Sequence, residues 1–84
     1  MPRYFVYVLE NLNGTLYIGH TDNLKRRIDQ HNSPEGKLHL GKYTHKNGPW
    51  NLIGTEPHPT RAHAMRRERQ LKGWKSPSKV RSLF

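Results

Sequence analysis

The sequence has no cysteine, which excludes disulfide bridges and zinc sites built on thiolates. It also has no apolar run long enough to cross a bilayer, and residues 1–4 lack the charged-then-apolar layout of a signal peptide. Six histidines are present, but His39, His45, His58 and His63 show no recognisable spacing of zinc ligands. These absences predict a soluble, cytoplasmic protein without structural zinc.

Acidic residues are scarce. The chain has 6 Asp and Glu against 15 Lys and Arg, a formal net charge of +9, and a pI near 10.4. Such an excess attracts polyanions and favours contacts with phosphate groups. We therefore expect a nucleic acid as partner, with a surface charged for solubility or a ribosome-associated protein as the alternatives. No lipidation motif or strongly amphipathic terminal helix points to a membrane surface.

Apolar residues are also few, at 32% of the chain, and the mean hydropathy is −1.00. Two Trp, four Tyr and two Phe enlarge this thin core, because each aromatic side chain buries a large area. The length of 84 residues suits one compact unit with no room for a second core. The sequence predicts a single domain over residues 1–84.

Three segments have the composition of strands. Residues 4–9 are β-branched and aromatic throughout, which indicates a strand covered on both faces. Residues 16–19 follow after a turn and complete a hairpin. Residues 49–55 form a third expected strand, and the run Pro57-His58-Pro59 is expected to end it.

The length of the hairpin loop decides which faces two tyrosines share. A two-residue Asn-Gly turn would place Tyr7 and Tyr17 on opposite faces of the sheet. A three-residue loop over residues 12–14, with Gly14 in the left-handed position, would set Gly19 opposite Tyr7 and both tyrosines on one face. The Asn-x-Asn-Gly-Thr composition suits the longer loop at least as well. We predict the three-residue loop.

Helices are expected between and after the strands. Thr21 or Asp22 can cap a helix that runs to about residue 32, and Thr60 can cap a longer one over residues 61–74. Residues 33–36 break the first helix and residues 37–48 read as a loop. Ser76-Pro77 starts a last short helix. The predicted order is β-β-α-β-α-α.

The first expected helix carries two polar residues beside its apolar stripe. Leu24 and Ile28 mark the stripe, and Arg27 and His31 lie on the same side. Arg27 could simply extend to solvent, and His31 could be a helix-end residue favoured by the helix dipole. Their placement is also compatible with a functional site.

The long helix carries an unusual acid. Ala64, Met65 and Leu71 span one side, and Glu68 falls between them as the single acid from residue 57 onward. An inward carboxylate is costly unless it is paired or bound to a cation. A salt bridge to Arg27 or a neighbouring base would explain it. A role as a Mg²⁺ ligand, completed by substrate phosphate and water, would explain it equally well.

Several motifs resemble the GIY-YIG nuclease family. Phe5-Val6-Tyr7 stands at the first motif, with Phe5 in place of its glycine, and Tyr17-Ile18-Gly19 matches the second. Residues 22–28 resemble the family's first-helix segment with its key arginine. Residues 42–44, 49–50 and 67–72 resemble the short single-domain bacterial branch, which is similar to the N-terminal domain of UvrC. The resemblance covers essentially the whole chain.

The resemblance implies an α+β fold with a small three-stranded antiparallel sheet flanked by helices. It also implies hydrolysis of DNA phosphodiester bonds with one divalent cation, Mg²⁺ or Mn²⁺. By position, Tyr7 would act as the general base with its pKa lowered by nearby cations, and Tyr17 would support it by hydrogen bonding. Arg27 would stabilise the scissile phosphate, His31 could relay a proton, and Glu68 would hold the metal.

The basic side chains are expected to bind the nucleic acid backbone. Those we predict in this role are Arg26, Lys42, Arg61, Arg66, Arg67, Arg69, Lys72 and Lys75. Backbone contacts alone give weak sequence specificity, so branched or damaged DNA is a candidate target and RNA a candidate partner. A monomer or weak homodimer is expected.

Two features of the sequence keep other functions open. The asparagine that many family members carry beyond the metal-binding glutamate has no counterpart, because no Asn follows Asn51. His20, which follows the second strand, could line the site or have a hydrogen-bonded loop role. A DNA- or RNA-binding module of the same fold that cleaves poorly is therefore an alternative, and a basic structural protein without a site is another.

Overall fold

The computed structural model describes residues 3–32 and 49–84. The elements are β1 (Tyr4–Glu10), β2 (Leu16–Thr21), α1 (Leu24–Asn32), β3 (Asn51–His58), α4 (Arg61–Gly73) and α5 (Pro77–Leu83). Their order is the predicted β-β-α-β-α-α. The loop predicted over residues 37–48, including Lys42, lies outside the described residues. No helix within the described ranges is long and apolar enough to cross a membrane.

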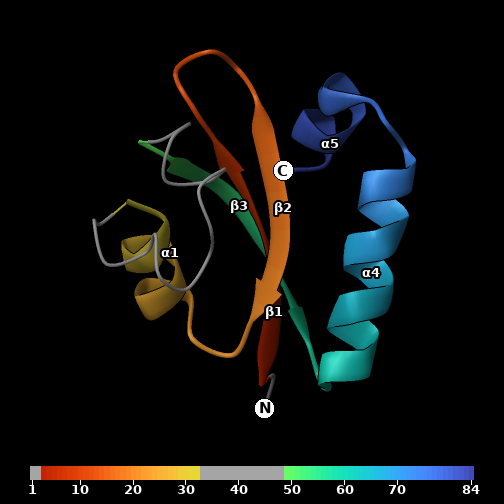
Figure 1. The fold of residues 1–84 in the computed structure, drawn as a ribbon. Coiled ribbons are helices and arrows are strands. Elements are labelled where there is room, and N and C mark those ends of the chain that lie inside the picture. Colours follow the sequence, from red (N-terminus) through yellow and green to blue (C-terminus); the bar gives the residue numbers. More distant parts are fainter. Residues whose placement is uncertain (1–2, 33–48) are drawn as a thin grey trace.

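The strands form one antiparallel sheet in the order β2-β1-β3, so the apolar β1 is central. Helix α1 covers one face of the sheet, and α4 and α5 cover the other (Figure 1). The expected α+β fold is confirmed. Because β2 is an edge strand, side chains from the helices on both faces can reach it.

The hairpin has the three-residue loop that the sequence favoured. Tyr7 pairs with Gly19 in the antiparallel register, which places Tyr7 and Tyr17 on the same face. Gly14 donates a backbone hydrogen bond to the carbonyl of Asn11 at 3.1 Å and has a φ of +80°. Glycine adopts this left-handed conformation without steric cost, which explains its place at the end of the loop.

Strand β3 begins and ends later than the predicted residues 49–55. Pro57 was expected to end it, yet Pro57 pairs with Phe5 and the strand continues to His58. Because β3 is an edge strand, a proline there removes no hydrogen bond that a further strand would need. The register shifts between Val8, which pairs with Gly54, and Leu9, which pairs with Leu52.

Two apolar clusters form on opposite faces of the sheet, because alternate side chains of β1 point in opposite directions. The cluster on the α1 side contains Tyr7, Leu9 and Trp50, with Tyr17, Leu24 and Ile28 packed against it. The cluster on the α4 side contains Val6, Val8, Ile18, Ala64, Leu71 and Val80. Met65 was predicted for the inward stripe of α4 but is 39% exposed, so this stripe is narrower than expected.

The caps of the helices agree only in part with the prediction. Asn23 caps α1 in place of either of the two residues before it, because its Oδ1 accepts from the backbone N–H of Arg26 at 3.0 Å. Thr60 caps α4 as predicted. Trp74 is the C-cap of α4 and lies just outside the helix. Ser76 caps α5, with a proline in its first turn.

Candidate active site

Two tyrosines and a histidine meet on the α1 face of the sheet. The ring centroids of Tyr7 and Tyr17 lie 6.3 Å apart with their planes at 30°. The hydroxyl of Tyr7 is 2.9 Å from Nε2 of His31, which comes from the last turn of α1. The rings of Tyr17 and His31 meet edge-on with centroids 4.7 Å apart. Tyr7 and His31 are almost completely buried.

Gly19 allows the phenol of Tyr7 to cross the edge strand. A Cβ at this position would lie 2.5 Å from the Tyr7 hydroxyl oxygen, closer than any side chain could be placed. The hydroxyl therefore lies directly over β2, the edge strand, and not over the middle of the sheet. The Tyr-Ile-Gly motif thus needs a glycine at position 19, because a larger residue there would clash with Tyr7 of the first motif.

Burial shifts the proton affinities of both hydrogen-bonded groups. The pKa of Tyr7 is raised well above its ordinary value by burial, with further contributions from Tyr17 and Glu68. Arg27 opposes this rise in the direction that we expected, but burial outweighs it. The protein groups alone therefore raise the pKa of Tyr7, where the sequence analysis expected nearby cations to lower it. Burial, and then Arg27, lower the pKa of His31 to about 4, so His31 is neutral near pH 7.

Two buried nitrogen atoms of the site have no hydrogen-bond partner among the described residues. They are Nε of Arg27 and Nδ1 of His31. Buried polar atoms without partners are rare in folded proteins because they lose the hydrogen bonds that water would provide. Both atoms belong to residues that were predicted from the sequence as catalytic candidates.

Glu68 reaches the site from α4, on the other face of the sheet. Its Oε1 lies 2.7 Å from Nδ1 of His20, and its Oε2 lies 2.9 Å from Nζ of Lys72. Burial alone would raise the pKa of Glu68, but the hydrogen bonds from Lys72 and His20 outweigh it and lower that pKa. The inward carboxylate is thus held by an ion pair with Lys72 and a hydrogen bond with His20, and not by Arg27.

The groups from both faces meet at β2. Tyr7 and Glu68 approach from opposite sides, and Glu68 is near enough to raise the pKa of Tyr7. A polar hollow of about 230 Å³ opens beside them, lined by Tyr4, His20, Thr21, Asp22, Arg27 and Arg61. Arg27 therefore faces the same hollow as His20, the partner of Glu68. The structure brings the sequence-predicted residues together along one strand.

The donor groups limit how a divalent cation could bind. No three His, Cys, Asp or Glu side chains gather at one point in residues 3–32 and 49–84. Glu68 offers a hard carboxylate oxygen beside His20, and its side chain is 20% exposed. One carboxylate fits Mg²⁺ when water and substrate phosphate supply the remaining ligands. Such an ion would replace Lys72 or His20 at the carboxylate.

The predicted nucleic-acid-binding residues fall into two groups. The exposed ones are Arg26, Arg61, Arg66, Arg69, Lys72 and Lys75. Arg67 instead forms an ion pair with Glu56 at 2.9 Å and lies 5.6 Å from the ring of Trp74. Lys72 is paired with Glu68. Arg67 is therefore part of the packing between α4 and β3.

One contact that builds the site was foreseen and another was not. The salt bridge to a neighbouring base that the sequence offered for Glu68 is formed by Lys72, and its i, i+4 helical spacing signals it. The clamp between Asn32 and Trp50 had no such signal. Asn32 donates to the carbonyl of Trp50 at 3.0 Å and accepts from its backbone N–H at 2.6 Å. This clamp holds Trp50 against Tyr17, with ring centroids 6.0 Å apart.

Known proteins share this combination of fold and motifs. A family model described as the GIY-YIG catalytic domain matches residues 3–81. The chain belongs to the GIY-YIG family. GIY-YIG domains are the catalytic domains of nucleases that act on nucleic acids and generally use divalent metals.

Similar small proteins occur in bacteria and archaea. UPF0213 protein NP_0776A of Natronomonas pharaonis is 37% identical over 78 residues, covering 93% of this chain and 87% of its own. A UPF0213 protein of Staphylococcus aureus is 31% identical over 83 residues, covering 99% and 96%. The solution NMR structure of UPF0213 protein BH0048 from Bacillus halodurans has a TM-score of 0.55 and 35% identity, covering 95% of this chain and 80% of that one. These names specify no activity, so the chemistry must be argued from the site.

Proposed function

We propose that this GIY-YIG domain is a divalent-metal-dependent endonuclease that hydrolyses DNA phosphodiester bonds with low sequence specificity. The observation that carries the proposal is the meeting of Tyr7, His31, Arg27 and Glu68 at the edge strand β2. These side chains come from both faces of the sheet, and the packing of the core does not require them to meet. The net charge of +9 supports a polyanionic substrate, with branched or damaged DNA as a candidate.

Arg27 is suited to hold the scissile phosphate. Its Nε is buried without a partner in the described part of the chain, and the residue lines the polar hollow together with Arg61. A phosphate oxygen would satisfy that nitrogen by a charge-assisted hydrogen bond. The planar guanidinium also matches the developing charge of a phosphoryl transition state.

Tyr7 and His31 are suited to move the proton of the attacking water. A free tyrosinate is disfavoured because the pKa of Tyr7 is raised. The hydroxyl can instead take a proton from water while it passes its own proton to Nε2 of His31, 2.9 Å away. Arg27 lowers the pKa of His31, and a phosphate bound to Arg27 would offset that effect. Substrate binding would thereby make His31 a better proton acceptor.

Glu68 is the residue that would hold the divalent cation. Such a cation supplies Lewis-acid stabilisation of charge on the phosphate and the leaving oxygen. Lys72 and His20 keep the carboxylate ionised before the cation binds, because they lower its pKa. Tyr17 packs against both Tyr7 and His31 and so fixes the position of the proton-transfer pair.

Cleavage of supercoiled, linear, branched and single-stranded DNA with Mg²⁺ or Mn²⁺ tests the proposal. We expect nicking by the wild type, and a loss of about a hundredfold or more for Glu68→Gln and for Tyr7→Phe. Glu10→Gln is the matched control for Glu68→Gln, since Glu10 is a partly buried acid paired with Arg81 at 2.7 Å. Equal cleavage by wild type and Glu68→Gln would identify a contaminant and overturn the proposal.

A DNA- or RNA-binding module without cleavage is the second candidate. The observation in its favour is that both carboxylate oxygens of Glu68 already have partners, His20 and Lys72. If those contacts persisted on the nucleic acid, they would compete with a cation for the carboxylate. Tight binding without cleavage on any of the substrates, at any Mg²⁺ or Mn²⁺ concentration, would favour this function.

A further inference from the structure

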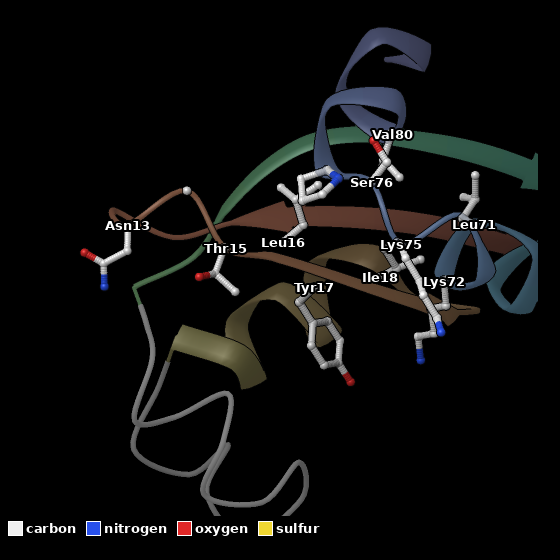
Figure 2. Close-up of a pocket in the computed structure, with 12 residues that line it drawn as sticks. Asn13, Thr15, Leu16, Tyr17, Ile18, Leu71, Lys72, Lys75, Ser76 and Val80 are labelled. Atoms are coloured by element: carbon white, nitrogen blue, oxygen red, sulfur yellow. The ribbon is translucent and has the colours of Figure 1, made fainter.

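A second, larger hollow lies along the same edge strand. It has a volume of about 530 Å³ and is bounded by the hairpin turn, the first half of β2 and the junction of α4 with α5. Figure 2 shows its lining residues coming from these three segments. The volume lies within the roughly 300–1,000 Å³ that is typical of small-molecule sites. The site described above uses only Tyr17 and Lys72 of its lining.

The floor of this hollow is apolar and its rim is basic. The aliphatic surface comes from Leu16, which is partly exposed, and from the edges of the otherwise buried Ile18, Leu71 and Val80. Lys72 and Lys75 lie at the rim, and their side chains extend to the same side as the phenol of Tyr17 (Figure 2). An apolar floor suits a flat, weakly polar group, and the ammonium groups suit phosphate. A nucleotide combines both chemistries.

The backbone at Lys75 supports a function for its side chain. Lys75 has a φ of +51°, in the left-handed region, directly after the C-cap of α4. Glycine or asparagine normally occupies this position, because a larger side chain is strained there. The side chain is exposed and no ion pair involves it within the described residues. A strained lysine at the rim of a pocket suggests that its charge is needed there.

We propose that this hollow is a nucleobase subsite, in which an unpaired base of the DNA strand packs on the apolar floor while Lys72 and Lys75 hold its flanking phosphates. The proposal rests on the endonuclease function above and names how that site holds its strand. The base would be next to the scissile phosphate, because Lys72 contacts Glu68 at 2.9 Å and Tyr17 belongs to both places. A peptide fits less well, since the rim and the net charge of +9 favour a polyanion.

The subsite predicts a particular path for the strand. The nucleobase hollow adjoins residues 13–18, and the polar hollow with Arg27 and Arg61 adjoins residues 20–22. Gly19, with the Tyr7 hydroxyl above it, lies between them. A strand running along β2 would thus place its base at one end of the site and a second phosphate at the other.

Methyl-resolved NMR tests the occupant without any cleavage. In EDTA, a short oligothymidylate is added to protein labelled at its Ile, Leu and Val methyl groups. We expect the signals of Ile18, Leu71 and Val80 to shift, and an analogue with one abasic position and the same number of phosphates to shift them much less. Equal shifts with both oligonucleotides would overturn the base subsite. Shifts that depend on protein concentration alone would assign the hollow to a second copy of the chain, and would also overturn it.

Lys75→Gly separates the role of the charge from that of the backbone. It removes the ammonium group and relieves the left-handed strain, so the melting temperature should stay equal or rise. The affinity for the oligothymidylate decreases as the salt concentration rises. We expect the plot of log affinity against log salt to become less steep by about 0.7, the value for one phosphate contact of a single strand. Lys25→Gln, which removes an exposed charge on α1, should leave the slope unchanged. Equal slopes for the two variants would overturn the role of Lys75.

Further measurements make the outcomes unambiguous. Lys75→Asn also tolerates the left-handed conformation and serves if the glycine variant unfolds. Methyl shifts without cleavage of any DNA would leave the subsite standing and refute the endonuclease function. Cleavage without base-dependent methyl shifts would refute the subsite and leave the endonuclease function standing.

Discussion

At the scale of single residues, the close approach of Tyr7 to Gly19 has the clearest consequence. An alanine at position 19 would place its Cβ 2.5 Å from the Tyr7 hydroxyl oxygen. The phenol would have to move away from His31, at a cost of about 1–3 kcal/mol typical of overpacking. We expect Gly19→Ala to lower the free energy of unfolding by that amount and to reduce DNA nicking more than stability alone explains.

Gly73→Ala is the control for this substitution. A Cβ at Gly73 would meet no atom within 4 Å, and alanine is favoured over glycine in a helix. Urea unfolding and nicking rates of the two variants, measured side by side, separate the steric effect from the loss of a glycine. A Gly19→Ala variant as stable and active as Gly73→Ala would show that the phenol does not lie over β2.

The buried His31 predicts a loss of stability in acid. Its pKa is about 4 in the folded protein against an ordinary value of 6.5. The unfolded chain therefore binds more protons between these values, so stability falls as the pH drops through this window. The loss in free energy of unfolding that is due to His31 should reach about 2 kcal/mol by pH 5.

Urea unfolding of wild type and His31→Gln at pH 7 and pH 5 measures this contribution. The variant lacks the titrating ring, so its stability should change less between the two pH values. Both proteins share the other histidines, whose titration cancels in the comparison, and pH 5 lies above the ordinary value for Glu68. Parallel losses in the two proteins would contradict the proposed burial of His31.

At the scale of elements, strand and helix order follow from local sequence, and their meeting points do not. The β-branched run of β1 and the three-residue loop ending at Gly14 determine the hairpin, and the register that places Tyr7 and Tyr17 on one face follows from the loop length. The persistence of β3 beyond Pro57 depends on its position at the sheet edge. The position of β3 in the sheet depends on tertiary structure and cannot be predicted from local sequence.

In the candidate site, too, some features follow from local sequence and others depend on tertiary packing. The inward position of Glu68 could be predicted from helical periodicity, but its pairing with His20 on another element could not. The raised pKa of Tyr7 depends on burial in the complete fold, so only the opposing effect of Arg27 could be predicted from the sequence. Local patterns thus identify candidate residues, whereas their electrostatics arise from packing.

Helix α4 offers a test of which arginines serve the fold. Arg67 contacts Glu56 and Trp74, whereas its neighbour Arg66 is exposed. We expect Arg67→Ala to lower the free energy of unfolding by about 1 kcal/mol. We expect Arg66→Ala to leave stability unchanged and to weaken DNA binding. Thermal unfolding and a DNA-binding titration of both variants check this, and reversed effects would contradict the assignment.

At the scale of the whole molecule, the single carboxylate couples metal binding to DNA binding. Glu68 is 20% exposed and both its oxygens have partners, His20 and Lys72, so the free protein should bind divalent cations weakly. Bound phosphates would add oxygen ligands and compete for Lys72, which releases the carboxylate. By thermodynamic linkage, cation and DNA must then strengthen each other's binding by the same factor.

This coupling can be measured with Ca²⁺, a divalent cation that also prefers oxygen ligands. We expect Ca²⁺ to tighten DNA binding about tenfold in the wild type, which corresponds to a coupling of about 1.4 kcal/mol. Glu68→Gln should abolish the gain, whereas Glu10→Gln should keep it. Ca²⁺ also screens charge and weakens DNA binding in general, so each comparison must be made at constant ionic strength. A gain of the same size in Glu68→Gln would show that the cation binds elsewhere, and would remove Glu68 from the metal site.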